Sequence, residues 1–191
     1  MASENHGIVT TRDAEEAGVP AVALRKLAQR GVLRQVARGV YLHAQVPRDR
    51  FTDMAEAVST VGHDGYVEWD AVLSLCDLAL VDPPFVRVGV NRRYRGAPRQ
   101  HVRVTRRRSP LTPRDLTYDE GVRGVTVERA LLDALDQIPL DRVLQAVTQA
   151  EVRGLLTTDE AVGIRAMSRS PHHRRHDGAV KSVGTTAKGR R

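Results

Sequence analysis

Apolar and polar positions near the start of the chain predict two short helices joined by a tight turn. Thr10 or Thr11 can cap the first helix, because a threonine hydroxyl at a helix start accepts an otherwise unpaired backbone N–H; the helix then continues to Ala17. Gly18-Val19-Pro20 ends it, since glycine adopts left-handed dihedrals and proline suits the first position of a new helix. The second helix covers residues 20–29, and its apolar face consists of Leu24, Leu27 and Ala28.

Residues 32–43 alternate apolar and polar side chains around Ala37-Arg38-Gly39, which predicts a two-stranded hairpin. Helix, turn, helix and hairpin follow one another in the order of a winged helix-turn-helix, in which the second helix enters the major groove and the hairpin is the wing. We expect Ala14 to face the second helix and Gly18 to make the turn, while Val19, Leu24 and Leu27 close a small core in this module.

The rest of the chain predicts helices, then strands, then helices again. Residues 51–61 and 68–80 have helical apolar periodicity, and Asp82-Pro83-Pro84 stops the second of these helices. Strands are predicted over residues 85–90, 101–105 and 121–127, and further helices over residues 126–137, 140–153 and 158–167.

Composition favours a mixed fold. The chain has 191 residues, of which 41% are hydrophobic and only 4% aromatic, so its core must consist mainly of Ala, Val and Leu. We predict the α+β class, with a winged helix-turn-helix over residues 1–48 and a second domain, with a small sheet and several helices, over residues 51–167. Residues 168–191 are basic and nearly free of apolar side chains, which predicts a disordered tail.

The outer face of the second helix carries residue types that read DNA bases, because arginine, lysine and glutamine donate to base edges in the major groove. We expect this helix to contact DNA through Ala21, Val22, Arg25, Lys26 and Gln29. Contacts to the sugar-phosphate backbone or the minor groove are expected from Thr10, Thr11, Arg12, Arg34 and Arg38. The alternative is a winged helix used only for protein contacts.

Charge is segregated along the chain. Residues 51–86 hold seven acidic and no basic side chains, whereas residues 87–114 hold ten arginines and no acid. Neighbouring blocks can neutralise each other in the fold; otherwise the arginine block is a surface for DNA or for an acidic protein. We identify a candidate toxin-binding or extended DNA-binding surface in Arg92, Arg93, Arg95, Arg99, Arg103, Arg106, Arg107 and Arg108.

Residues that enzymes and metal sites need are mostly missing. Neither GxxxxGK[ST] nor GxGxxG occurs, residues 27–180 contain no lysine for a nuclease-type site, and the acids look unclustered. Asp133 and Asp136 are interpreted as the polar face of a helix, and Tyr66 and Trp69 as core anchors. His172, His173 and His176 fall in the predicted tail. We therefore expect no catalytic residue, cofactor or metal.

Localisation follows from what the sequence lacks. Its one cysteine, Cys76, cannot form an internal disulfide, which favours a reducing compartment. No secretory signal or membrane-length apolar stretch is visible. We expect a cytoplasmic protein without membrane contact.

The order of several motifs resembles the AbiEi family of bacterial antitoxins, which are transcriptional regulators of type IV toxin-antitoxin systems. The motifs are GIVTTRDAEEAGV, RGVYL, EWDAVLSLCDL and GVTVERALLDAL, and the similarity extends over residues 7–165, particularly to short actinobacterial members. The resemblance implies an N-terminal winged helix that represses its own operon at inverted repeats, as a monomer or a dimer. It also implies a C-terminal domain that neutralises a nucleotidyltransferase-like toxin.

Two other hypotheses remain open. The chain could be a stand-alone regulator whose second domain senses a small ligand. A neighbouring gene for a nucleotidyltransferase-like toxin would argue against this hypothesis. A nuclease-like enzyme joined to a DNA-binding module is the third, and Mg²⁺-dependent cleavage would favour that one.

Overall fold

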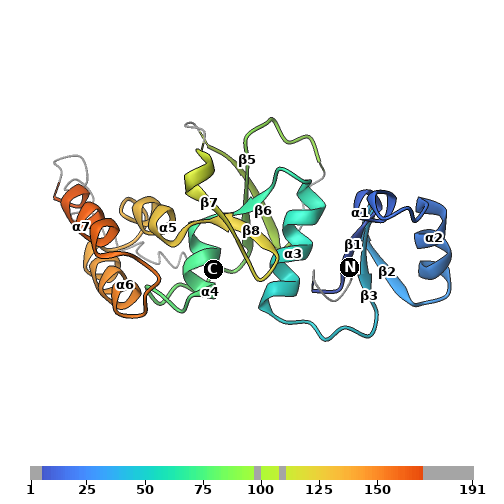
Figure 1. Cartoon of the computed structure of the whole chain (residues 1–191), viewed down its shortest axis with the longest axis horizontal. Coiled ribbons are helices and arrows are strands. Elements are labelled where there is room, and N and C mark those ends of the chain that lie inside the picture. The colour runs from blue at the N-terminus through green and yellow to red at the C-terminus, as the bar shows by residue number, and fades with distance from the viewer. Residues whose placement is uncertain (1–5, 97–99, 108–110, 170–191) are drawn as a thin grey trace, which may run out of the picture.

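The computed structural model describes residues 6–96, 100–107 and 111–169, and its mixture of helices with two sheets confirms the predicted α+β class (Figure 1). The N-terminal part forms one three-stranded sheet in the order β1-β3-β2, with both pairs antiparallel. Its elements are β1 (Ile8–Thr10), α1 (Thr11–Glu16), α2 (Ala21–Gln29), β2 (Leu33–Ala37) and β3 (Val40–His43).

Helix α1 begins as its sequence predicts. The Thr10 hydroxyl accepts a hydrogen bond from the backbone N–H of Asp13 over 3.1 Å, and the Asp13 carboxylate accepts one from the N–H of Thr10 over 3.1 Å. This reciprocal cap satisfies two backbone donors at the helix start. Gly18 then turns the chain with a φ of 76°.

The small core beneath α1 and α2 differs from the prediction at one position. Ala14 and Leu24 are buried in it, but Val19 is 37% exposed, so its assignment to this core is wrong. The backbone N–H of Val19 donates to the Ala14 carbonyl over 2.7 Å, which fixes the turn without burying the side chain. The sheet fills the space instead, through Val9, Leu33 and Tyr41.

The second sheet has the strand order β6-β5-β4-β8-β7. Strands β5 and β6 are parallel, as are β4 and β8, whereas the pairs β4–β5 and β7–β8 are antiparallel. Two of its strands, β4 and β7, were not expected from the sequence pattern. The bounds are β4 (Tyr66–Val67), β5 (Val86–Val90), β6 (Val102–Arg106), β7 (Leu116–Asp119) and β8 (Val122–Val125).

Helix α4 (Trp69–Leu75) is shorter than the helix predicted over residues 68–80. Asp77, Ala79 and Leu80 have φ values of 51°, 58° and 48°, which no right-handed helix accommodates. The apolar sequence pattern extends beyond the end of α4 because Leu78, in the following loop, is also fully buried. Its backbone N–H donates to the Leu73 carbonyl over 2.8 Å.

The three predicted C-terminal helices are present as α5 (Val127–Ala134), α6 (Leu140–Val152) and α7 (Thr158–Met167). They gather at the opposite end of the molecule from α2 (Figure 1). Ser168, the first residue of the predicted tail, is buried and donates to the Arg165 carbonyl over 2.8 Å. Residues 170–191, with the three tail histidines, lie outside the described residues.

Helix α3 (Arg50–Val61) lies between the two sheets (Figure 1). Ile8, Val40 and Leu42 of the first sheet belong to the same buried cluster as Met54 and Ala55 of this helix. The main core therefore continues across residues 48–51, where the sequence suggested a boundary. Within the described ranges, no helix has the length and apolarity needed to cross a membrane.

Candidate nucleic-acid interface and a buried charge network

The outer face of α2 is open to solvent at one end of the molecule's long axis (Figure 1). Val22, Arg25, Lys26 and Gln29 are exposed, and Ala21 is half-buried. Within the part of the chain that the structure describes, the side chains of Arg25, Lys26 and Gln29 have no hydrogen-bond or ion-pair partner. These three polar groups are therefore available to a ligand outside the protein.

The hairpin β2–β3 is fastened to the start of α1. The Thr11 backbone N–H donates to the Gly39 carbonyl over 2.8 Å, and the Thr11 hydroxyl donates to the same oxygen over 3.3 Å. Gly39 has a φ of 72°, which glycine adopts without steric cost. Arg34 is exposed on β2, and Arg38 precedes Gly39 at the hairpin turn.

The polar residues at the start of α1 already have partners inside the protein. Thr10 caps the helix, Thr11 holds the hairpin, and the Arg12 Nε donates to the Glu16 carboxylate over 2.7 Å. This ion pair is mostly exposed, so solvent screens it and it is weak. Arg12 can exchange it for a phosphate at little cost.

Four predicted contact residues line one cleft of about 700 Å³, in company with side chains that sequence reasoning missed. The cleft separates α1 and the hairpin turn from the β7–β8 hairpin and the loop after α3. Tyr118, which is 71% exposed, and Arg123 come from β7 and β8, and His63 comes from the loop. No local motif marks these residues; only the fold brings them to Thr10, Thr11, Arg12 and Arg38.

The arginine block does not form one uniform surface. Arg92 is paired with Asp64 at 2.9 Å, and Arg107 is mostly buried between two carboxylates. Arg103 lies over the Phe85 ring, with its guanidinium carbon 4.9 Å from the ring centre. Arg93, Arg95 and Arg106 are exposed. Arg99 and Arg108 lie outside the described residues.

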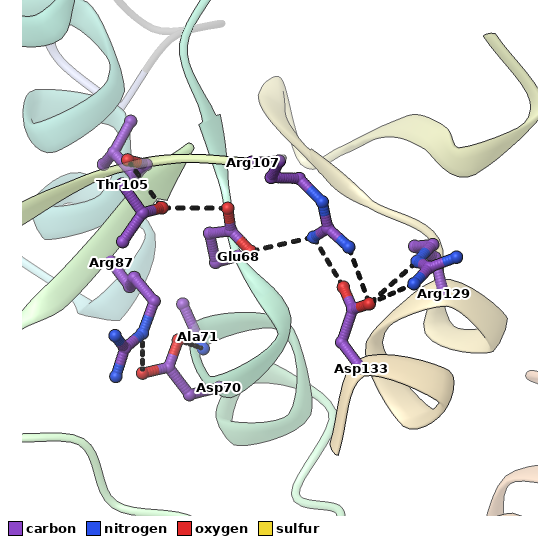
Figure 2. Close-up of polar contacts among 9 residues, drawn as sticks. Glu68, Asp70, Ala71, Arg87, Thr105, Arg107, Arg129 and Asp133 are labelled. Carbon is purple, nitrogen blue, oxygen red and sulfur yellow. Dashed lines mark hydrogen bonds and ion pairs between the residues drawn. The ribbon is translucent and has the colours of Figure 1, made fainter. Parts of the chain in front are cut away.

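Acidic side chains that are far apart in sequence pair with arginines in two neighbouring sets (Figure 2). Glu68 and Asp133 with Arg107 and Arg129 form a charge network, and Asp70 pairs separately with Arg87. Arg107 Nη1 lies 3.0 Å from Glu68 Oε2 and 2.6 Å from Asp133 Oδ2, and Arg107 Nη2 lies 2.6 Å from Asp133 Oδ1. Arg129 also donates to Asp133, with its Nε at 2.9 Å. Arg87 Nε donates to Asp70 Oδ2 over 3.0 Å.

The network changes the interpretation of Asp133. Its side chain is only 11% exposed and is paired with two arginines, so it is a buried acceptor and not just part of the polar face of α5. The reason is tertiary: Glu68 directly follows β4, Arg107 directly follows β6 and Asp133 lies on α5, so three separate segments build the network. The local sequence around each residue shows only an ordinary polar position.

Burial sets the protonation of the groups at the centre. It raises the pKa of Glu68, which is 4% exposed, although Arg107 and a hydrogen bond from Thr105 act in the opposite direction. Burial also raises the pKa of Tyr66 to about 12, with the Glu68 charge adding to the effect. The hydrogen bond to Asp133 raises the pKa of Arg107, which stays a cation.

Within the described ranges, no group of three or more His, Cys, Asp and Glu side chains is arranged to hold a metal ion. The network carboxylates direct their oxygens at arginines. As arranged, they act as hydrogen-bond acceptors that fix guanidinium groups in place.

Comparison with known proteins gives one family match. Residues 1–42 match the family described as "Transcriptional regulator, AbiEi antitoxin". No curated protein matches the chain. Among solved structures, the crystal structure of RV2827C protein from Mycobacterium tuberculosis is similar at 16% identity and a TM-score of 0.47, over 90% of this chain and 78% of that one.

Proposed function

We propose that this protein is a non-enzymatic transcriptional regulator that binds double-stranded operator DNA through a winged helix formed by residues 8–43. The observation that carries the proposal is the exposed α2 face, where Arg25, Lys26 and Gln29 lack partners among the described residues. A helix of this kind fits the major groove, and its free donors match the acceptors of guanine and adenine edges. The family match over residues 1–42 supports the same reading.

In this proposal the flanking residues position the protein on the backbone. Arg34 and Arg38 contact phosphates or the minor groove, while Thr10, Thr11 and Arg12 orient the start of α1 beside them. The operator contains inverted repeats, which two copies of the chain occupy either as a dimer or as neighbouring monomers.

Fluorescence anisotropy with duplex DNA from upstream of the protein's own gene tests the assignment. The variant Arg25→Ala/Lys26→Ala loses specific binding, because the base-reading donors are gone. The matched variant Arg114→Ala/Arg142→Ala removes the same charge from exposed positions away from α2 and binds normally. Equal affinities for the two variants would contradict the assignment of α2 as the DNA-binding helix.

We further propose that the protein is an antitoxin that neutralises a nucleotidyltransferase-like toxin. The family description supports the antitoxin role. The exposed arginines Arg93, Arg95, Arg103 and Arg106 offer a surface for an acidic partner, since opposite charge steers association.

Growth rescue on co-expression with the neighbouring gene tests this second role in the full chain. Arg93→Glu/Arg95→Glu abolishes rescue, whereas Arg114→Glu/Arg142→Glu and Arg25→Ala/Lys26→Ala preserve it. Rescue by the Arg93→Glu/Arg95→Glu protein would remove the arginine surface from the account, and absence of rescue by the wild-type chain would remove the antitoxin role.

A further inference from the structure

Strand β6 lies at one edge of the five-stranded sheet, and within the described residues β5 is its only strand neighbour. We infer that this edge receives an extended segment of a partner protein as an added strand, and that the segment alternates acidic and apolar side chains. The inference deepens the proposed antitoxin role, on which it rests for the identity of the partner. An unpaired sheet edge offers a row of backbone donors and acceptors, which is the basis of strand addition.

The pairing of β5 with β6 identifies the backbone groups that face outward. At the start of this parallel ladder the Val86 N–H donates to the His101 carbonyl over 2.8 Å. Because a parallel strand bonds to its neighbour through alternate residues, Arg103 and Thr105 also direct their N–H and C=O groups at β5. The outward groups belong to the residues between them: Val102, Val104 and Arg106. Within the part of the chain that the structure describes, these outward groups have no hydrogen-bond partner.

The two faces of β6 differ in chemistry, because successive side chains of a strand point to opposite faces. On one face, Val102 and Val104 are only partly buried, against a cluster that contains Val61 of α3. On the other face, Arg103 is exposed. An added strand continues both faces, so its apolar side chains lie beside the two valines and its acidic side chains beside Arg103.

Charge along β6 favours an acidic segment. The Arg103 guanidinium carbon lies 4.9 Å from the centre of the Phe85 ring, and the Arg87 guanidinium carbon lies 5.4 Å from the same point. Arg106 is exposed at the other end of the strand. Among the described residues, neither Arg103 nor Arg106 has an ion-pair partner. A carboxylate on the added strand supplies one, since opposite charges on neighbouring strands stabilise the pair.

Acidic side chains of this chain also reach the edge, but they are already paired. Asp53 and Glu56 of α3 line a pocket of about 710 Å³ together with Val102, at the start of β6. Both carboxylates form ion pairs with Arg48. They therefore do not neutralise the arginines of β6.

A second copy of this chain fits the edge less well. Two β6 strands would bring arginines against arginines, which destabilises a strand pair. Strand β7, at the opposite edge of the sheet, has the exposed Asp119 at its end, followed by the exposed Glu120, so it can offer acids to β6 of another copy. That contact is head-to-tail and builds open chains of molecules, not a closed dimer.

A peptide titration tests the inference without the partner protein. The probe is a seven-residue peptide of alternating glutamate and valine, with blocked ends and a fluorescent label, and the control peptide has lysine in place of glutamate. Each is titrated with the full-length protein, and binding is followed by fluorescence anisotropy. We expect saturable binding of the glutamate peptide, at least about tenfold tighter than that of the lysine peptide, because only the former offers carboxylates to the arginines.

The variant Val104→Pro tests the backbone contact itself. The Val104 N–H points away from β5, so proline removes a donor that only an added strand uses, and an edge strand accepts proline at such a position. Val104→Ala also removes the valine side chain but keeps the N–H. We expect Val104→Pro to weaken binding of the glutamate peptide about tenfold or more, and Val104→Ala to weaken it by no more than about threefold.

Two further measurements keep the test decisive if Val104→Pro fails to fold, as judged by circular dichroism. Arg103→Glu weakens binding of the glutamate peptide about tenfold or more, whereas Arg114→Glu makes the same change at an exposed position outside β6 and leaves binding unchanged. Amide hydrogen exchange followed by NMR locates the added strand. On binding, the N–H groups of Val104 and Arg106 become at least about tenfold more protected, while that of Thr105 is protected already.

Three results would overturn the inference: no saturable binding of the glutamate peptide, equal binding of the lysine peptide, or equal losses in Val104→Pro and Val104→Ala. Light scattering detects the other occupant. A mass that grows with protein concentration, and that Val104→Pro returns to the monomer value, would assign the edge to β7 of another copy and also overturn the inference. Growth rescue by the wild-type chain tests the antitoxin role separately, so the two failures are distinguishable.

Discussion

Asp133 and Glu68 both contact Arg107, yet they do not contribute equally to the charge network. Asp133 receives hydrogen bonds from two arginines, whereas Glu68 shares Arg107 with it and accepts its other bond from the neutral Thr105 hydroxyl. Removing one partner of a buried ion pair leaves the other charge uncompensated. Loss of the Asp133 charge would leave two arginines, Arg107 and Arg129, without this partner.

We predict that Asp133→Asn lowers the free energy of unfolding by about 3 kcal/mol. Glu68→Gln lowers it by no more than about 1 kcal/mol, because burial already disfavours the Glu68 charge and glutamine retains an acceptor for Thr105. Urea unfolding at neutral pH gives both values. A larger loss for Glu68→Gln than for Asp133→Asn would contradict this ranking.

Tyr66 makes stability depend on alkaline pH. Its folded-state pKa of about 12 lies above the ordinary value of 10, so the folded chain retains a proton that the unfolded chain releases. The corresponding stability is fully present below pH 10 and is lost as pH rises from 10 to 12. We predict that urea-unfolding stability falls less steeply over this range in Tyr66→Phe than in the wild type. Identical slopes would mean that Tyr66 ionises normally.

At the scale of elements, the sequence pattern predicts most of the fold and fails where tertiary contacts outweigh local signals. The capped helix α1 is predicted by its local cap residues, and β5 by its alternating valines, although the burial along β5 does not alternate. Strand β4 has two residues, too few to show a period, although it is central in its sheet. The helical periodicity also predicts which face of α2 is exposed. The charge network and the Tyr118 side of the cleft depend on long-range packing, which no local pattern shows.

The loop after α4 stores strain that its sequence does not relieve. Leu80 has a φ of 48° and is 85% exposed, so it bears the cost of a left-handed conformation without burying its side chain. We predict that Leu80→Gly raises the free energy of unfolding by about 0.5 kcal/mol, after the extra freedom of glycine in the unfolded chain is subtracted. Leu80→Ala separates backbone strain from loss of the side chain, and a gain as large as that of glycine would contradict a backbone origin.

At the scale of the whole molecule, the proposed DNA-binding module shares its core with the rest of the described chain. Leu42 of β3 and Met54 of α3 belong to one buried cluster, which also reaches the second sheet. Residues 6–48 therefore pack through one continuous core against the second sheet and its helices.

We predict that Leu42→Ala destabilises the entire chain by about 2–4 kcal/mol in a single transition. Unfolding followed by far-ultraviolet circular dichroism and by Trp69 fluorescence shifts by the same amount, although Trp69 lies outside residues 1–48. An early transition seen only by circular dichroism would show that the module unfolds separately.

Helix α2 is proposed to read base edges and not only to contact the DNA backbone. Anisotropy titrations compare upstream operator DNA with a scrambled duplex of equal length, for the wild type, Arg25→Ala and Arg34→Ala. We predict that Arg25→Ala lowers the ratio of the two affinities by about tenfold or more, because it removes base contacts, whereas Arg34→Ala weakens both duplexes equally and preserves the ratio. An unchanged ratio in Arg25→Ala would contradict the central claim.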